Sequence, residues 1–457
     1  MFYNQAPLTY LDDITRQINL IGQHIAEAGG IRVAIYLPNS IELLVTLFAC
    51  SFYPNLTTVL IPFDVSNEEL VSMLRRSAAD TMVTAPGAFP FDAVVQAYPS
   101  LRQLIWVTDE GSNHMDWNEV PEGTGGKINV ATWQDILRES PVHAGSELPA
   151  ADPEKTPSDV VTFWQTEAGQ VEEMVRFSQA NLVSAISAQL AAIPTKERIN
   201  PSDLFLPADS LANVYTLVHT LGALYSNASI ALNSVAGKSP DLVLATQGVA
   251  PTVLVASPET LLKTHRESTS RLGSALANVS HVMSTRSLAL EGIHSTSNLL
   301  SGFSGASPSL GTTPGKLRLV LVAERAGADT PLLSANVLSD LRIFTGARVV
   351  YALTAAKVAG AISQTAFYDY RLPTDAKTHF GPPLTSVEVF LKDSGVHKTT
   401  DDKIEGQVRN FLEHWFIHLR RCTNIIQIVV KGPSVAGGEV NVGVAGKIRH
   451  DNTLAYA

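Results

Sequence analysis

Residues 32–62, RVAIYLPNSIELLVTLFACSFYPNLTTVLIP, are the stretch that decides the fold class. They begin with an apolar run at 33–37, which a Pro-Asn-Ser turn closes, and a helical pattern follows at 41–52. A second apolar run lies at 58–62. Strand, helix and strand in such short steps are typical of a parallel sheet with helices on both faces. The stretch therefore predicts an α/β fold.

The same alternation continues on both sides of this stretch. Upstream, residues 9–28 place apolar side chains at helical spacing before a Gly-Gly pair. Downstream, Ser66 and Glu69 have the spacing of a capping box at a helix start, and 81–84 is the next short strand. The first part of the chain therefore predicts one sheet of parallel strands.

The rest of the chain changes character several times. Residues 109–157 are polar and rich in Gly, Pro and acids, which predicts surface loops. Residues 268–315 are rich in Ser, Thr, Gly and Ala, and they predict a weak helix and a flexible loop. We expect a further helix at 181–192 and strands at 160–164, 229–232, 252–256, 317–322 and 346–351. Apolar runs at 387–391 and 425–430, between Gly/Pro turns, predict a small β-rich module.

The composition excludes several classes of protein. Of the 457 residues, 45% are hydrophobic and 17% are charged, which excludes a disordered chain. A net charge of -10 argues against a nucleic-acid partner, because binding to phosphates needs a basic surface. Cys50 and Cys422 are the only cysteines, so no disulfide framework is expected and a reducing compartment is favoured.

Three further stretches of the sequence bear on localisation. The first residues lack a basic region followed by an apolar run, so we expect an intracellular protein that is not secreted. The longest uncharged stretch, 210–237, is interrupted by His219 and several asparagines, which favours a buried helix and a buried strand over a transmembrane span. A His-Trp-Phe-Ile-His pattern within 410–421 fits core packing, or contact with a membrane or a partner. We therefore expect a cytoplasmic protein or one peripheral to a lipid-handling membrane.

Several stretches, in the same order along nearly the whole chain, resemble the adenylate-forming superfamily, which includes acyl-CoA synthetases, coumarate-CoA ligases and the adenylation domains of peptide synthetases. They are TYLDDITRQINLIGQHI (9–25), RVAIYLPNSIELLVTLFAC (32–50), IPFDVSNEELVSMLRRSAADTMVT (61–84), SQANLVSAI (178–186), LRLVLVAERAG (317–327), GARVVYALTAAKVAGAISQT (346–365), GPPLTSVEVFLKD (381–393), IVVKGPSVAGG (428–438) and VGVAGKIRHDNTL (442–454). The GPPL and GPSV turns are most similar to those of fatty acyl-CoA synthetases.

The resemblance implies a domain organisation. Residues 1–375 correspond to the two α/β subdomains of the AMP-binding large domain, each with a covered, mostly parallel sheet. Residues 376–457 correspond to its small β-rich third subdomain. We expect the family's C-terminal domain, which carries its catalytic Lys, to be absent; a truncated gene model is the alternative explanation.

The family's phosphate loop is a Ser/Thr/Gly-rich turn with a Pro-Lys-Gly, directly before a helix. Glycines let backbone N–H groups approach the phosphates, hydroxyls add hydrogen bonds, and the Lys neutralises charge. The corresponding stretch here, 164–174, retains Thr166 and Gly169 but has no Lys. The resemblance therefore implies Thr166 and Gly169 as cofactor-binding candidates.

The same loop carries three carboxylates, on Glu167, Glu172 and Glu173. Like charges about 4 Å apart repel by about 1 kcal/mol in water, and by more where solvent is excluded. These side chains therefore oppose a bound triphosphate, unless a basic residue such as Arg176 compensates for them.

The family's Tyr-Gly-x-Thr-Glu motif corresponds to Tyr351–Ala355. Tyr351 and Thr354 are retained and are the other two cofactor-binding candidates, although Tyr351 is equally well explained as a packed aromatic at a strand end. Ala355 stands where the family has a Glu linked to Mg²⁺, and it offers no side-chain oxygen. Val444 stands where a family Asp holds the ribose hydroxyls, and the lost hydrogen bonds amount to about 1–3 kcal/mol. The resemblance thus leaves no metal site and no catalytic residue.

These replacements predict a divergent AMP-binding protein that does not activate acids with ATP. We expect a pseudoenzyme that binds a fatty acyl or lipid ligand, or a scaffold for a protein partner, with no cofactor. The alternative is an active ATP-dependent fatty acyl-CoA ligase, which forms an acyl adenylate and then a thioester, with an unusual site for ATP and Mg²⁺. A third hypothesis is a pure interaction protein, which would hold no lipid.

Overall fold

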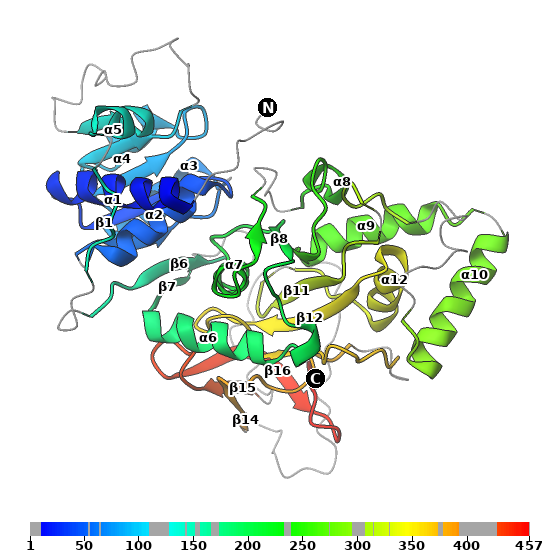
Figure 1. Cartoon of the computed structure of the whole chain (residues 1–457). Coiled ribbons are helices and arrows are strands. Elements are labelled where there is room, and N and C mark those ends of the chain that lie inside the picture. Colours follow the sequence, from blue (N-terminus) through cyan, green and yellow to red (C-terminus); the bar gives the residue numbers. More distant parts are fainter. Residues whose placement is uncertain are drawn as a thin grey trace.

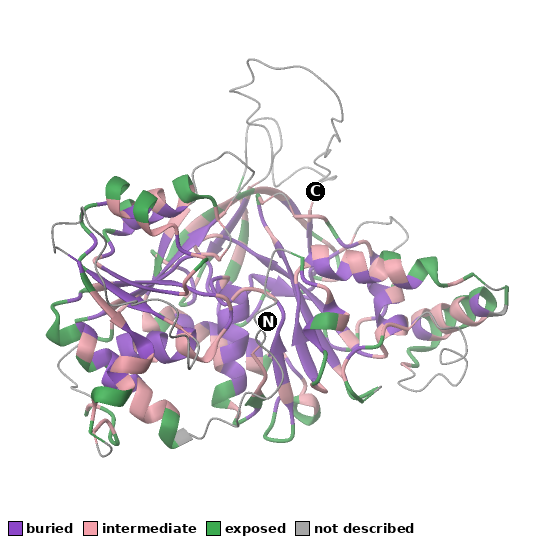
Figure 2. Cartoon of the chain, turned by 90° about the horizontal axis from the view of Figure 1, so that it is seen from above, coloured by how far each residue is buried: buried purple, intermediate pink, exposed green. Residues whose placement is uncertain are grey.

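Three β-sheets carry the fold, and α-helices cover the two larger ones (Figure 1). Figure 2 shows that the buried residues are concentrated in these sheets and in the helix faces that pack on them. The computed structural model describes residues 11–456 except 54, 64, 109–127, 142–143, 151–155, 166–172, 233–238, 274, 295–306, 314, 329, 373–377 and 393–426.

The first sheet has seven strands in the order β5-β4-β3-β1-β2-β6-β7. Its strands are β1 (Arg32–Tyr36), β2 (Thr57–Leu60), β3 (Thr81–Thr84), β4 (Gln103–Trp106), β5 (Asn129–Thr132), β6 (Val160–Trp164) and β7 (Glu173–Phe177). All neighbours are parallel except β6 and β7, which are antiparallel. Nearly every residue of β1, β3 and β6 is buried, because helices cover both faces of the sheet.

The helices within this part of the chain are α1 (Leu11–Glu27), α2 (Ile41–Phe52), α3 (Asn67–Ser77), α4 (Phe91–Ala97) and α5 (Trp133–Glu139). Residues of α1, α2 and α5 join one core cluster, whereas α3 and α4 belong to another, on the opposite face. The capping box expected at the start of α3 is present: Ser66 Oγ accepts from the Glu69 amide at 3.3 Å, and Glu69 Oε2 accepts from the Ser66 amide at 2.9 Å.

The second sheet has six strands in the order β13-β12-β11-β10-β8-β9. Its strands are β8 (Leu204–Pro207), β9 (Ser229–Ile230), β10 (Val253–Val255), β11 (Leu319–Arg325), β12 (Arg348–Thr354) and β13 (Ser363–Gln364), and only β13 runs antiparallel to its neighbour. The helices of this part are α6 (Gln179–Ala191), α7 (Val214–Tyr225), α8 (Leu242–Ala245), α9 (Pro258–Ser270), α10 (Ala275–Arg286) and α12 (Ala335–Thr345). A π-helical turn (Ser287–Glu291) directly follows α10.

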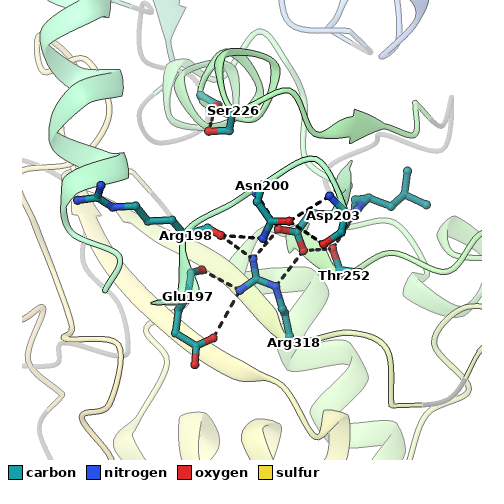
Figure 3. A network of polar contacts seen from close by, with 10 residues as sticks. Glu197, Arg198, Asn200, Asp203, Ser226, Thr252 and Arg318 are labelled. Carbon is teal, nitrogen blue, oxygen red and sulfur yellow. Dashed lines mark hydrogen bonds and ion pairs between the residues drawn. The ribbon is translucent and has the colours of Figure 1, made fainter. Parts of the chain in front are cut away.

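A polar network ties the amino ends of β8, β10 and β11 together (Figure 3). Arg318 donates from Nε to Asp203 Oδ1 at 2.9 Å and from Nη2 to Asp203 Oδ2 at 2.7 Å. Thr252 Oγ1 donates to the same carboxylate at 2.7 Å, and Arg318 Nη1 donates to the Glu197 carbonyl at 2.9 Å. Burial acts to raise the pKa of Asp203, but the hydrogen bonds from Arg318 and Thr252 outweigh it and lower that pKa. The network therefore stabilises the edge of the sheet opposite its carboxyl ends.

The third sheet is antiparallel, in the order β14-β15-β16-β17. Its strands are β14 (Glu388–Lys392), β15 (Gln427–Lys431), β16 (Glu439–Ile448) and β17 (Leu454–Tyr456). Ile428, Val430 and Leu454 of this sheet belong to the same core cluster as β8, β10, β11 and β12. The β-rich part therefore packs on the second sheet rather than forming a core of its own.

The structure confirms the predicted α/β architecture of two mostly parallel sheets and a small β-rich third one. Two local predictions were wrong. The segment 129–139, expected as surface loop, forms β5 and α5, and Trp133 anchors it at 1% exposure. The strand expected at 229–232 is a two-residue edge strand and is not buried. Nothing described bears on the boundary at residue 375, which stays a prediction.

Among the described residues, no helix is both long and apolar enough to cross a membrane. The segment 410–421 and its histidines lie outside the described residues.

Candidate functional site

The parallel strands of the second sheet all end at the same side, which we call the carboxyl edge. Ligands of open α/β sheets bind at this side, because the loops that follow the strands diverge there. Asp209 follows β8, Glu259 follows β10, Glu324 and Arg325 end β11, and Thr354 ends β12. Charged and polar side chains from four strands thus gather at one edge.

The first sheet contributes Asn39, which lies just after β1 and is 1% exposed. Its Nδ2 donates to the carbonyls of Pro207 and Asp209 at 3.1 and 2.8 Å, and its Oδ1 accepts from the Leu211 amide at 2.9 Å. The three contacts are to the last residue of β8 and to the loop that follows it. Asn39 therefore fixes the carboxyl ends of the two sheets against each other.

Arg325 spans the same junction. Its guanidinium carbon lies 4.6 Å from the ring centroid of Trp164, at the end of β6, and its Nη2 donates to the Gln165 carbonyl at 3.4 Å. Nε of Arg325 is buried and has no hydrogen-bond partner within the described part of the chain. Burial lowers the pKa of Arg325, whereas the carboxylates of Asp209, Glu259 and Glu324 act to raise it. The edge thus has a cation stacked on an aromatic ring, whose Nε–H has no partner among the described residues.

Glu324 directly precedes Arg325 in β11 and is 3% exposed. Its Oε1 accepts from Thr330 Oγ1 at 2.8 Å, and its Oε2 accepts from the Tyr351 hydroxyl at 3.0 Å. Burial raises the pKa of Glu324 to about 7, even though both hydrogen bonds favour the ionised form. This carboxyl group therefore exchanges its proton near neutral pH.

Two of the predicted cofactor-binding residues belong to this network. Tyr351 and Thr354 are both 0% exposed. The Tyr351 hydroxyl, which donates to Glu324, also accepts from the Leu333 amide at 3.2 Å. Thr354 Oγ1 donates to the Glu324 carbonyl at 2.8 Å. Both hydroxyls are thus bonded within the chain, and a contact of either with a nucleotide stays a prediction.

The other two candidates, Thr166 and Gly169, lie outside the described residues, as do Glu167 and Glu172. The sequence therefore remains the only basis for their role.

The acidic loop ends at Glu173, the first residue of β7. Its Oε1 lies 2.8 Å from Lys357 Nζ, whereas Arg176, the base considered from the sequence, lies 3.8 Å from Asp159. Lys357 is therefore the cation that neutralises Glu173.

Ala355 and Val444, which the resemblance matched to metal and ribose ligands of the family, also have apolar surroundings. Ala355 is 2% exposed within the core cluster of the second sheet, and Val444 packs against that cluster. Across the described ranges, no group of three or more His, Cys, Asp or Glu side chains could hold a metal ion.

Sequence reasoning missed Asn39, Glu324, Arg325 and Lys357. One signal was available for two of them: Glu324 and Arg325 are a charged pair directly after the apolar run 319–323. In a parallel sheet such a pair must lie at the carboxyl edge, where ligands bind. Asn39 and Lys357 gave no such signal because their partners are distant in sequence.

Comparisons with known proteins found matches to the structure but none to the sequence. No family model and no curated protein matches the sequence. The anthranilate CoA ligase AuaEII, in complex with anthranoyl-AMP, matches in structure with a TM-score of 0.65 at 14% identity, over 97% of this chain and 71% of the ligase. A benzoate CoA ligase from Burkholderia xenovorans LB400 gives a TM-score of 0.62 at 14% identity, over 97% and 73% of the two chains.

A putative long-chain-fatty-acid CoA ligase from Rhodopseudomonas palustris CGA009 matches with a TM-score of 0.59 at 16% identity, over 97% of this chain and 91% of that one. At such low identities the likeness concerns the fold, and it extends over almost the whole of this chain. The chain has the fold of the adenylate-forming acyl- and aryl-CoA ligases.

Proposed function

We propose that this chain is a pseudoenzyme of the adenylate-forming fold, which binds an acyl ligand at its carboxyl edge and does not activate it with ATP. The observation that carries the proposal is the closed hydrogen-bond network around Glu324. Tyr351 and Thr354 direct their hydroxyls to Glu324 at 3.0 and 2.8 Å, and both side chains are fully buried. A nucleotide that bonded to either hydroxyl would have to break these buried bonds, and each unsatisfied group would cost about 1–3 kcal/mol.

Three replacements support the same proposal. The loop before β7 has carboxylates and no Lys where a triphosphate would need positive charge. Ala355 and Val444 offer no oxygen to a metal ion or a ribose, and both pack in or against the apolar core. The chain thus uses these positions for packing and internal hydrogen bonds.

We assign the carboxylate of the ligand to Arg325. A guanidinium pairs with a carboxylate through parallel N–H donors, and stacking on an aromatic ring fixes its plane. Arg325 is held over Trp164 at 4.6 Å, and its Nε has no other partner among the described residues. Long-chain fatty acids are the first class to test, because the turns of the β-rich part are most similar to those of fatty acyl-CoA synthetases.

Two measurements test the proposal. Pyrophosphate exchange is measured on the purified chain with ATP, Mg²⁺ and a panel of aromatic and fatty acids, and no exchange above background is expected. Native mass spectrometry should detect a copurified carboxylic acid, and Arg325→Met should lose it. The matched control is Arg176→Met, because Arg176 is exposed and lies within β7, paired with Val161 of β6, rather than at the carboxyl edge of the second sheet. Robust exchange would refute the proposal.

The alternative is an active acyl-CoA ligase that binds ATP in an unusual way. One observation favours it: Lys357 Nζ lies 2.8 Å from Glu173, which directly follows the predicted phosphate loop. Lys357 would then replace the missing loop Lys. This function predicts pyrophosphate exchange that Lys357→Met abolishes and Lys357→Arg partly restores.

The presence or absence of a bound acid distinguishes an acyl-binding protein from a scaffold. We expect an intracellular acyl-binding protein, consistent with the two unpaired cysteines expected from the sequence. A chain that carries no acid, and that binds none from the panel, would instead be an interaction protein.

A further inference from the structure

Glu324 is a buried carboxyl group next in the chain to the cation that we assign to the ligand. The donors to its two oxygens are neutral hydroxyls, those of Thr330 at 2.8 Å and of Tyr351 at 3.0 Å. Among the described residues, no Lys, Arg or His side chain donates to it. Burial disfavours a carboxylate that has no bonded cation, and such a group takes up a proton more readily. The charge of Glu324 therefore depends on the charges within electrostatic range.

Arg325 is the cation that acts on Glu324 from this range. Burial raises the pKa of Glu324, the charge of Glu259 on α9 raises it further, and the charge of Arg325 acts to lower it. Two tyrosines also face this carboxyl group, Tyr351 of β12 and Tyr456 of β17, and burial raises the pKa of both. Both tyrosines are neutral near pH 7. The ionised form of Glu324 therefore relies on the charge of Arg325.

A bound acid changes this balance. Three carboxyl groups already act on Arg325, those of Asp209, Glu259 and Glu324. The carboxylate of a ligand would be the fourth, and its charge offsets that of the guanidinium. Carboxylates that share a site favour the protonation of one of them. Glu324 is the most buried of the three, whereas Glu259 is partly exposed and Asp209 accepts hydrogen bonds at 2.8, 2.9 and 3.1 Å.

We propose that a carboxylic acid binds to Arg325 together with a proton that Glu324 takes up from the solvent, so that the carboxyl edge releases its ligand as the pH rises. This coupling rests on the proposed acyl binding and adds a regulation to it. The pKa of Glu324 is about 7 in the free chain, and a ligand that offsets the charge of Arg325 raises it further. The complex then keeps a proton that the free chain has lost, and the affinity falls over this pH interval.

Calorimetric titration of the full chain with octanoate and with benzoate, from pH 6 to pH 9, tests the proposal. The dissociation constant should rise about tenfold over this range, which corresponds to a shift of about one pKa unit. At pH 7.5 the measured heat should depend on the ionisation enthalpy of the buffer, with about half a proton taken up per bound acid. At pH 6 this dependence should nearly vanish, because the free chain already carries the proton.

Glu324→Gln removes the proton site and keeps the hydrogen bonds, because an amide can accept from Tyr351 and donate to Thr330. The variant should bind each acid with the same dissociation constant at pH 6 and at pH 9, without proton uptake. Glu197→Gln is the matched control, since Glu197 lies at the opposite edge of the same sheet, 3.8 Å from Arg318. The control should keep the tenfold change.

A dissociation constant that stays the same from pH 6 to pH 9 in the unmodified chain overturns the inference and leaves the proposed acyl binding in place. A pH dependence that Glu324→Gln keeps and Glu259→Gln removes would assign the proton to Glu259, which also overturns it. The proton count needs no variant, so it decides the question even if Glu324→Gln does not fold. Binding of neither acid at any pH overturns the inference too, and the search for a copurified acid then decides the proposed function separately.

Discussion

At the scale of single residues, Glu324 decides what the carboxyl edge can do. It is almost fully buried and binds the side chains of Thr330 and Tyr351, while its carbonyl binds Thr354. The aromatic ring and the hydroxyl that sequence reasoning assigned to a cofactor are thereby part of an internal network. The charged group next to Glu324 in the chain is Arg325, which is stacked on Trp164.

The raised pKa of Glu324 predicts a pH dependence of stability. Its pKa is about 7 in the folded chain, against 4.5 for an unperturbed Glu, so the folded state binds the proton more tightly. The contribution is complete below pH 4.5 and is lost as the pH rises through about 7, and it amounts to about 3 kcal/mol at most. Urea unfolding of the unmodified chain and of Glu324→Gln at several pH values checks this. The free energy of unfolding of Glu324→Gln should fall less between pH 4.5 and pH 7 than that of the unmodified chain. An equal pH dependence of the two chains would contradict the prediction.

At the scale of elements, α9, α10 and α12 are joined by one carboxylate. Asp340 of α12 lies 2.9 Å from His265 of α9 and 3.2 Å from His281 of α10. Burial acts to raise the pKa of Asp340, but the hydrogen bonds from the two histidines lower it. The same contacts hold α10 against α12.

Removing this carboxylate should loosen α10. Asp340→Asn should lower the free energy of unfolding by about 1–2 kcal/mol and speed amide exchange in 275–286 more than elsewhere. Hydrogen–deuterium exchange with mass spectrometry measures this. Asp159→Asn is the control, because Asp159 pairs with exposed Arg176 at 3.8 Å, and exposed pairs contribute about 0–1 kcal/mol. Unchanged exchange in α10 would show that apolar contacts alone hold it.

At the opposite edge of the second sheet we expect a larger loss of stability than for Asp340→Asn. Arg318→Ala leaves the Asp203 carboxylate, which is 4% exposed, without its cation, so the free energy of unfolding should fall by about 3–5 kcal/mol. Lys392→Ala removes an ion pair of similar length, 2.8 Å, from an exposed site and should cost less than about 1 kcal/mol. Chemical denaturation of both variants checks the difference, and equal losses would mean that the network of Figure 3 contributes little.

At the scale of the whole molecule, the second and third sheets share one core, and their backbones meet at Gly381. Its φ is +74°, and a Cβ there would lie 1.9 Å from the Gln364 carbonyl oxygen of β13. Gly381→Ala should therefore lower the free energy of unfolding by about 3 kcal/mol or more. Gly437→Ala, at φ +79° with open space around it, should lose only about 1–2 kcal/mol. Thermal unfolding should show a larger loss of stability for Gly381→Ala than for Gly437→Ala. A larger loss for Gly437→Ala would show that the close approach of the Gln364 carbonyl is not what requires a glycine at 381.

The sequence predicted the strands well where every residue of the strand is buried, as in β3 and β6, whose bounds were predicted correctly. It failed at β5 and α5, because short elements within a polar segment owe their stability to tertiary contacts such as those of Trp133. At the site, the sequence predicted that a strand ends at Tyr351, whereas β12 continues to Thr354 and Tyr351 lies in its middle. Their bonds to Glu324 could not be predicted, because they depend on which strand lies beside β12.

The central claim is that internal hydrogen bonds close the carboxyl edge to a nucleotide. Calorimetric titration of the full-length chain with MgATP tests this claim most directly. We predict no saturable heat up to millimolar ATP, because the Tyr351 and Thr354 hydroxyls stay bonded to Glu324. Saturable binding with one ATP per chain would contradict the account.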